Sequence, residues 1–168
     1  MDSGSNDVQG DFGIEKMVDI IGEHPDSPII INSAARNVEG IREFGEILNA
    51  LDDVVTLWPV NTERDSIVLL KDFFQTVHTR ICIVKNGYFG NKEDFGLLSE
   101  SKFAAIPSVF LPQATDAIRA AMYNERVPFH KADDHLSFGG RLLGNQWLLK
   151  ATDAIKQAIE QAATSELA

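Results

Sequence analysis

The sequence lacks the cysteine pairs that would stabilise a chain by disulfide bonds and the long apolar stretches that would anchor it in a membrane. It has one cysteine among 168 residues, which excludes an internal disulfide framework. No stretch approaches the roughly 20 apolar residues of a membrane span, and the polar start lacks the basic and apolar regions of a secretory signal. We therefore expect a soluble, cytoplasmic protein that does not bind membranes.

Positive charge is also scarce. Lys and Arg total 15 against 25 Asp and Glu, which gives a formal net charge of -10. Excess negative charge repels the phosphates of nucleic acids, so direct capture of DNA or RNA is disfavoured. We expect no direct nucleic-acid binding, and any role on DNA would need a protein partner or a local basic patch.

Several motifs that carry chemistry are missing. The sequence contains neither the P-loop pattern G-x-x-x-x-G-K-[ST] nor the dinucleotide pattern G-x-G-x-x-G. The four histidines and the single cysteine do not have the spacing of a zinc site, and no nucleophile elbow is present. A polar cluster at 130–135 either binds a cation or is an ordinary solvated loop. We predict no catalytic residue and no metal-ligating residue.

The composition suits one globular domain, because 44% of the residues are hydrophobic and 24% are charged. Residues 1–10 are rich in Gly, Ser, Asn and Asp and are predicted to be a disordered terminus. Residues 11–168 are predicted to form a single α/β domain, with 136–165 as a C-terminal helical segment.

Strand and helix patterns alternate along the chain. Consecutive apolar residues, typical of strands covered on both faces, occur at 28–32, 54–58, 81–84 and 106–111. Helical periodicity occurs at 12–21, 38–51, 65–77 and 115–124. This alternation predicts a mostly parallel sheet with helices on both faces. Cys82 and most of the Phe and Trp side chains are predicted to lie in the core.

The last part of the chain has a different pattern. We predict a linking loop at 126–135, followed by a helix over 136–163 that is either continuous or broken near Gly144. The apolar positions of this helix either pack into the core or bind a partner.

Ligands of parallel α/β sheets bind beyond the carboxyl ends of the strands. Asn86 ends the third apolar run, and Pro112 and Gln113 follow the fourth. The Asn86 amide could donate to and accept from a purine edge, or it could be there because Asn suits the turn before Gly87. Our candidate cofactor-binding residues are therefore Asn86, Pro112 and Gln113, and the neighbouring Tyr88 and Phe89 are candidates for a ligand or partner contact.

The ordered segments IIINSAA, VVTLWPVNTERDSIVLLKDFF, ICIVKNGYFG and IPSVFLPQATDAIRAAMYNERVPF resemble the later part of ParA/MinD-type P-loop ATPases, especially the plasmid stability and mobilisation proteins. The resemblance covers about residues 26–132. It implies a P-loop NTPase-like sheet that lacks the first nucleotide-binding strand, and an adenine contact by Asn86. Asp65 or Ser66 would begin a helix of the family, where either side chain can accept hydrogen bonds from first-turn amides.

The chain differs from the family at the positions that bind phosphate and the metal ion in that family. The Walker A motif is absent, and Asn32 stands where the family has its switch Asp. An amide cannot supply the negative charge that favours a hard cation. The chain thus looks like the carboxyl-terminal portion of such a protein, or a descendant without the front end. ATP or ADP with Mg is the implied cofactor, and hydrolysis by this chain alone is not expected.

The resemblance implies a nucleotide-binding-like domain of a ParA-like ATPase that acts in plasmid partition, stability or mobilisation. A sheet without its P-loop strand would have unpaired apolar edges, so we expect self-association, as a dimer. Direct pairing of 29–31 with 54–58 would instead permit a four-stranded monomer. The alternative function is a non-enzymatic protein-interaction scaffold that binds a protein partner and no nucleotide.

Overall fold

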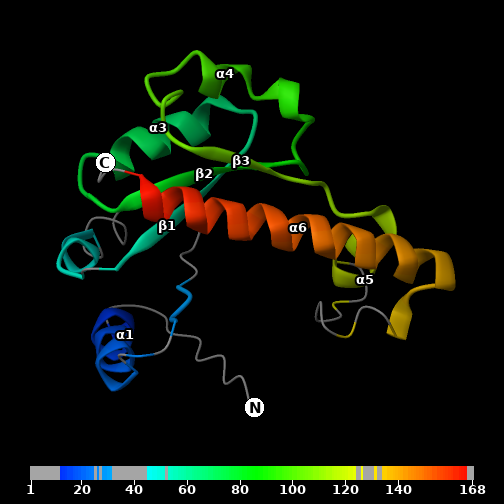
Figure 1. Ribbon diagram of the computed structural model, residues 1–168, viewed down its shortest axis with the longest axis horizontal. Helices are drawn as coiled ribbons and strands as arrows, with labels where there is room; N and C mark the ends of the chain where they lie inside the picture. The colour runs from blue at the N-terminus through cyan, green and yellow to red at the C-terminus, as the bar shows by residue number, and fades with distance from the viewer. Residues whose placement is uncertain are drawn as a thin grey trace.

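The computed structural model describes residues 12–24, 26, 28–31, 45–51, 53–123, 126, 131 and 134–165. Within them the chain alternates strands and helices (Figure 1). The elements are α1 (Phe12–Glu23), β1 (Val55–Val60), α3 (Arg64–Phe73), β2 (Arg80–Asn86), η1 (Lys92–Asp94), α4 (Gly96–Ser99), β3 (Ser108–Leu111), α5 (Asp116–Tyr123) and α6 (Phe138–Thr164).

Three parallel strands form the sheet in the order β1-β2-β3, which makes β2 the inner strand. These strands are the runs predicted at 54–58, 81–84 and 106–111, so the parallel α/β sheet is confirmed in the described part of the chain. Pro59 lies within the edge strand β1, and Pro107 lies just before β3. Both are places in a sheet where a missing N–H is tolerated.

The strand predicted at 28–32 is wrong for the residues that the structure describes. Residues 28–31 form no strand and pair with none of the three strands, and Asn32 lies outside the described residues. The side chain of Ile30 is 95% exposed. β-branched residues favour a strand only where neighbouring chain supplies a ladder and a covered face. The described sheet therefore has three strands rather than four, and β1 and β3 are its edges.

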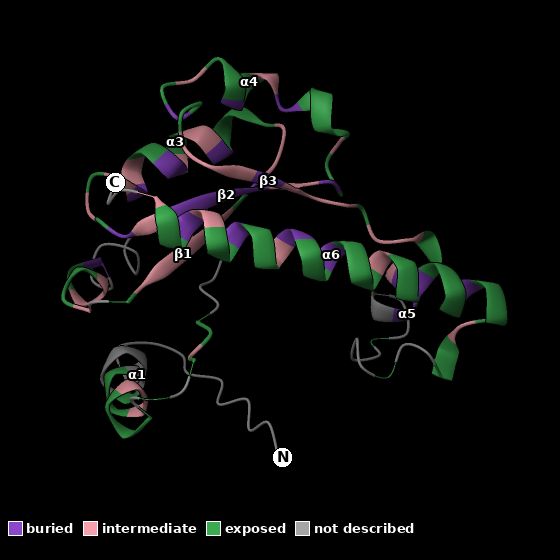
Figure 2. Cartoon of the chain, in the orientation of Figure 1, coloured by how far each residue is buried: buried purple, intermediate pink, exposed green. Residues whose placement is uncertain are grey.

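Both faces of the sheet are covered, by α3 and α4 on one side and by α6 on the other (Figures 1 and 2). Alternate residues of β2 pack on opposite faces of the sheet. Ile81 and Ile83 join the core beneath α3, while Cys82 and Val84 pack with Ala158 of α6. This double coverage explains why the strand reads as an unbroken apolar run.

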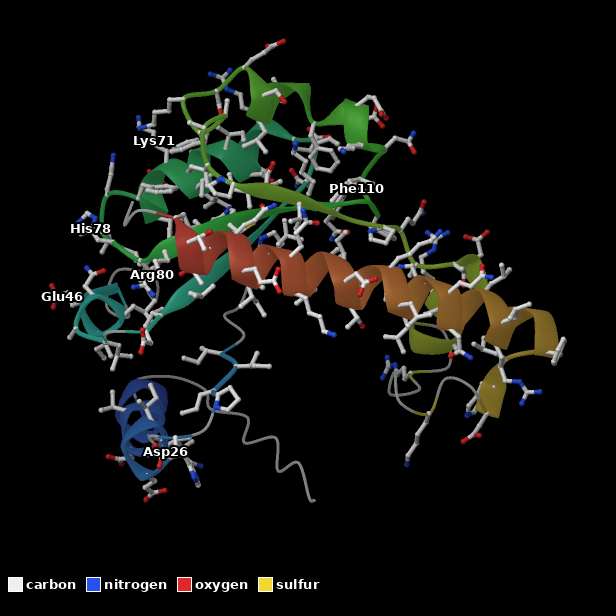
Figure 3. All side chains as sticks on the ribbon, viewed as in Figure 1. Asp26, Glu46, Lys71, His78, Arg80 and Phe110 are labelled. Atoms are coloured by element: carbon white, nitrogen blue, oxygen red, sulfur yellow. The ribbon has the colours of Figure 1, made fainter. Side chains whose placement is uncertain are left out.

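Aromatic rings fill much of the core on the α3 side. The ring centroids of Phe73 and Trp58 lie 4.7 Å apart, and those of Phe74 and Phe103 lie 5.2 Å apart. Phe110, labelled in Figure 3, packs against the same cluster from β3. The predicted packing role of these aromatic residues is confirmed.

The helix predicted at 38–51 is described only in part, and residues 45–49 are helical. Asn49 connects this segment to the loop between α3 and β2. Its Nδ2 donates to the Thr76 carbonyl at 2.8 Å, and its Oδ1 accepts from the His78 amide at 2.7 Å.

The last helix, α6, is continuous over 27 residues, so Gly144 does not break it. The Ser137 side chain caps its start by accepting from the Gly140 amide at 3.1 Å. A Cβ atom on Gly144 would lie 3.2 Å from Ile118 Cδ1 of α5. The small residue at this position lets the two helices lie close together.

Two predicted segments fall largely outside the described residues, namely the terminus at 1–10 and most of the loop at 126–135. The predicted helices at 65–77 and 115–124 are found as α3 and α5, with α3 ending at Phe73. None of the helices in the described ranges combines the length and apolar character that a membrane crossing requires.

Candidate functional site

The three parallel strands end on the same edge of the sheet, which we call the carboxyl edge. β1 ends at Val60, β2 at Asn86 and β3 at Leu111, and Asn86 and Leu111 are direct partners in the register. The loops that follow the strands therefore meet at this edge. It is the place where a parallel α/β sheet binds ligands.

The turn from β1 into α3 is held by its own polar side chains. Asn61 Oδ1 accepts from the Glu63 amide at 2.8 Å and from the Ser66 hydroxyl, while Ser66 Oγ accepts from the Asn61 amide at 3.0 Å. Asp65 Oδ1 accepts from the Ser66 amide at 2.8 Å, which is a first-turn contact of the kind predicted for Asp65. Ser66 itself is buried. These contacts position the start of α3 at the carboxyl edge.

Asn86 lies at the carboxyl edge and also forms the turn that follows it. Its Oδ1 accepts from the Tyr88 amide at 3.0 Å, and its carbonyl accepts from the Phe89 amide at 3.1 Å. The turn role that Asn was expected to suit is therefore present. Asn86 is partly buried, and among the residues that the structure describes its Nδ2 atom has no hydrogen-bond partner.

The structure brings Pro112 and Gln113 next to the turn that begins at Asn86. The Gly87 amide donates to the Leu111 carbonyl at 2.8 Å. A Cβ atom on Gly87 would lie only 2.8 Å from the Gln113 nitrogen. The three predicted site residues thus lie in one junction between the ends of β2 and β3, with the Gln113 side chain exposed.

Trp147 connects α6 to the junction between the ends of β2 and β3. Its Nε1–H donates to the Pro112 carbonyl at 2.8 Å. The packing predicted for this Trp therefore includes a specific polar contact, which periodicity alone does not reveal.

Replacing Trp147 with Phe is expected to lower the free energy of unfolding by about 1 kcal/mol, because the Pro112 carbonyl loses its donor while most of the ring packing remains. Urea denaturation measures the change. A slowly exchanging Trp147 indole proton in the wild type provides the control for the hydrogen bond, and unchanged stability in the variant would contradict its contribution.

One further residue at this edge, Arg119 of α5, was not predicted from the sequence. Its guanidinium carbon lies 5.6 Å from the ring centroid of Tyr88, and its Nη2 pairs with Asp116. The Arg119 Nε atom is buried and has no hydrogen-bond partner among the described residues. Tyr88 and Phe89 are about half exposed. Helical periodicity cannot detect Arg119, since its contact is with Tyr88, 31 residues earlier in the chain.

These side chains combine exposed aromatic rings, the amides of Asn86 and Gln113, and the guanidinium of Arg119. Such a set can stack on a flat ring, bond to its polar edge and attract negative charge. No three His, Cys, Asp or Glu side chains in the described ranges are arranged to hold a metal ion.

Cys82 is a core residue rather than a site residue. It is fully buried against α6, and its Sγ lies 3.8 Å from Gln161 Oε1. Burial raises the pKa of the Cys82 thiol, so the reactive thiolate is disfavoured near neutral pH. The predicted packing role of Cys82 is confirmed.

Comparison with known proteins finds a relative across most of the chain. Protein MobD from Acidithiobacillus ferrooxidans is 30% identical over 158 residues, which cover 87% of this chain and 70% of that protein. No protein-family model matches the chain, and no solved structure matches it.

Proposed function

The chain belongs to the same family as Protein MobD, and from this premise we propose that it acts in plasmid mobilisation as a nucleotide-binding-like domain of the ParA type. The proposal combines the family, whose name points to mobilisation, with the resemblance to the later part of ParA/MinD-type ATPases. A P-loop NTPase-like arrangement of the sheet is part of the same proposal.

The position of Asn86 carries the proposal. It ends the inner parallel strand, its Nδ2 has no partner among the described residues, and the ring of Tyr88 lies in the adjoining turn. A purine offers both a polar edge and a flat face, so an amide and an aromatic ring at one edge are suited to it. Gln113 adds a second exposed amide beside the same junction.

The proposal concerns binding of ATP or ADP and not hydrolysis by this chain alone. The sequence contains no P-loop lysine, and Asn32, where the resemblance expects Asp, is a neutral amide outside the described residues. Within the described ranges no group of three His, Cys, Asp or Glu side chains could hold a metal ion, so we assign no residue to magnesium. We therefore derive no phosphoryl-transfer step.

A thermal-shift titration tests nucleotide binding. ATP or ADP with Mg at 100 times its dissociation constant is expected to add about 2.7 kcal/mol of stability. For a domain of this size this corresponds to a rise in Tm of about 5–10 °C.

The variant Asn86→Asp tests whether the side-chain amide of Asn86 contributes to nucleotide binding. An aspartate keeps an oxygen to accept from the Tyr88 amide but replaces the two N–H donors with negative charge, so the nucleotide-dependent shift should disappear while the Tm without ligand changes little. Asn91→Asp is the matched control, because it adds the same charge to an exposed Asn that also accepts from backbone through its side chain. Equal shifts in the wild type and in Asn86→Asp would contradict the proposal.

One observation favours the alternative, a scaffold without nucleotide. Asn86 Oδ1 is already used by the turn, so the residue has a structural reason to be there even if no base binds. The scaffold predicts no thermal shift with either nucleotide, and the same titration therefore separates the two functions.

A further inference from the structure

The carboxyl edge contains a pair of residues that is chemically labile. Asn86 is the only asparagine of the sequence that is followed by a glycine. Asparagine is among the thermolabile residues of proteins. The backbone nitrogen of the next residue can attack its side-chain carbonyl carbon, and a glycine at that position has no side chain to hinder the attack. The pair Asn86-Gly87 is therefore able to react without an enzyme.

The reaction is a deamidation, and water and hydroxide are its only co-reactants. The Gly87 nitrogen gives its proton to hydroxide and attacks Cγ of Asn86, which forms a C–N bond and closes a five-membered succinimide ring. The bond from Cγ to Nδ2 breaks, and ammonia leaves after taking a proton from water. A second water then adds to either ring carbonyl and opens the ring, which leaves aspartate or isoaspartate in place of Asn86. No group is oxidised or reduced.

The structure shows why each residue of the pair is present. Asn86 Oδ1 accepts from the Tyr88 amide at 3.0 Å, which supports the turn after β2. Gly87 is buried, and a Cβ atom on it would lie 2.6 Å from the Leu111 carbonyl oxygen. A larger residue at 87 would force the strand ends apart, and an apolar residue at 86 would lose the turn contact. The fold therefore keeps a labile pair at the carboxyl edge.

The same contacts also restrain the pair. The Gly87 N–H donates to the Leu111 carbonyl at 2.8 Å, so hydroxide cannot remove its proton while this bond is made. Asn86 ends strand β2, and ring closure requires rotation about its ψ angle away from the extended value of a strand. Leu111 is the register partner of Asn86 on β3. The reaction therefore requires the ends of β2 and β3 to separate.

We propose that Asn86 is a site of spontaneous deamidation that the closed junction between β2 and β3 protects, so that it reacts only in molecules in which the two strand ends have separated. Local openings of this kind need less free energy than global unfolding. The aspartate product has the side chain of the variant Asn86→Asp, and the isoaspartate product adds one carbon atom to the main chain. Either product removes the amide from the carboxyl edge and permanently marks a molecule that has opened.

Mass spectrometry tests the proposal on wild-type protein incubated at mildly alkaline pH, either folded or in urea. Trypsin cleaves after Lys85 and Lys92 and releases the peptide 86–92, whose fragments separate Asn86 from Asn91. In urea Asn86 is expected to react faster than Asn91, which is followed by lysine. In the folded protein Asn86 is expected to react at least about tenfold more slowly than in urea, which corresponds to an opening free energy of at least about 1.4 kcal/mol. Equal rates in the two conditions would overturn the proposal.

Two variants separate local opening from global unfolding. Trp147→Phe removes the donor to the Pro112 carbonyl at the junction, so it is expected to raise the rate at Asn86 in the folded protein about fivefold. Ile83→Val is the matched control, because it lowers global stability by a similar amount but leaves the strand ends intact. The control should react at the wild-type rate. Equal acceleration by both variants would mean that the reaction follows global unfolding and would overturn the proposal, as would an unchanged rate in Trp147→Phe.

Amide hydrogen exchange of Gly87 provides an independent measurement. Exchange of this proton and deamidation of Asn86 both require the Gly87 N–H to leave the Leu111 carbonyl. Folding should therefore slow the two reactions by similar factors. Slow deamidation beside a freely exchanging Gly87 amide would contradict protection by the junction. These measurements contain no nucleotide, so their outcome is independent of the thermal-shift titration.

Discussion

Replacing Gly87 with alanine is expected to lower the free energy of unfolding by about 3 kcal/mol. A Cβ atom at this position would lie 2.6 Å from the Leu111 carbonyl oxygen, 2.8 Å from the Gln113 nitrogen and 2.9 Å from Phe110 Cζ. Two of these atoms belong to the backbone, so a side-chain rotation cannot relieve the contact. The ends of β2 and β3 must separate, and the hydrogen bond from the Gly87 amide to Leu111 would be strained or lost.

Urea denaturation of Gly87→Ala measures the loss, and Gly139→Ala is its matched control. Nothing lies within 4 Å of a Cβ atom built on Gly139, which is in the first turn of α6. Alanine favours helix over glycine by up to about 1 kcal/mol, so the control should be at least as stable as the wild type. If both variants have the stability of the wild type, the close approach at Gly87 is not as the structure describes.

The same substitution also tests the carboxyl edge. Separation of the strand ends would move Asn86 relative to Gln113, so any ligand that needs both residues should bind more weakly to Gly87→Ala. Binding that survives unchanged in a destabilised Gly87→Ala variant would indicate a site that does not use this junction.

Replacing Ile83 with alanine is expected to cost about 4 kcal/mol. Ile83 is fully buried in the inner strand β2, within the core that also contains Leu70 and Phe73 of α3. The truncation removes three carbon atoms from a position that is enclosed by the sheet and the helix, so little relaxation can fill the space. For a domain of this size the expected fall in Tm is about 8–16 °C.

A graded series provides the control for Ile83. Ile83→Val removes one carbon and should cost about 1 kcal/mol, and Val68→Ala, at a half-exposed position of α3, should cost less than Ile83→Ala. Calorimetry or urea denaturation of the three variants measures the order. A small effect of Ile83→Ala would mean that β2 is not the inner strand.

The strands show which parts of the fold can be predicted from residue order. The runs at 54–58 and 81–84 were predicted as strands covered on both faces, because consecutive apolar residues have no polar side to turn to water. The run at 28–32 has the same character, yet residues 28–31 form no strand. Periodicity measures the tendency to form a strand but cannot supply the neighbouring strand that stabilises it.

The candidate site likewise has one part that could be predicted from the sequence and another that could not. The positions of Asn86, Pro112 and Gln113 at one edge follow from parallel topology, which brings the carboxyl ends of strands together. The Trp147 hydrogen bond to Pro112 and the placement of Arg119 over Tyr88 do not follow from it. Both join residues that are distant in the chain, and their contacts depend on how α5 and α6 pack.

Local chemistry in the sequence was therefore sufficient for the α/β class, three of the strands and the buried thiol, since each depends on residues close together in the chain. Long-range packing determines which strand each edge strand pairs with. It also determines whether α6 is continuous and on which face of α6 the large apolar residues lie. A helix pattern shows which positions are apolar, but only the packed sheet decides that the small residues of α6 are buried and that its large apolar residues are exposed.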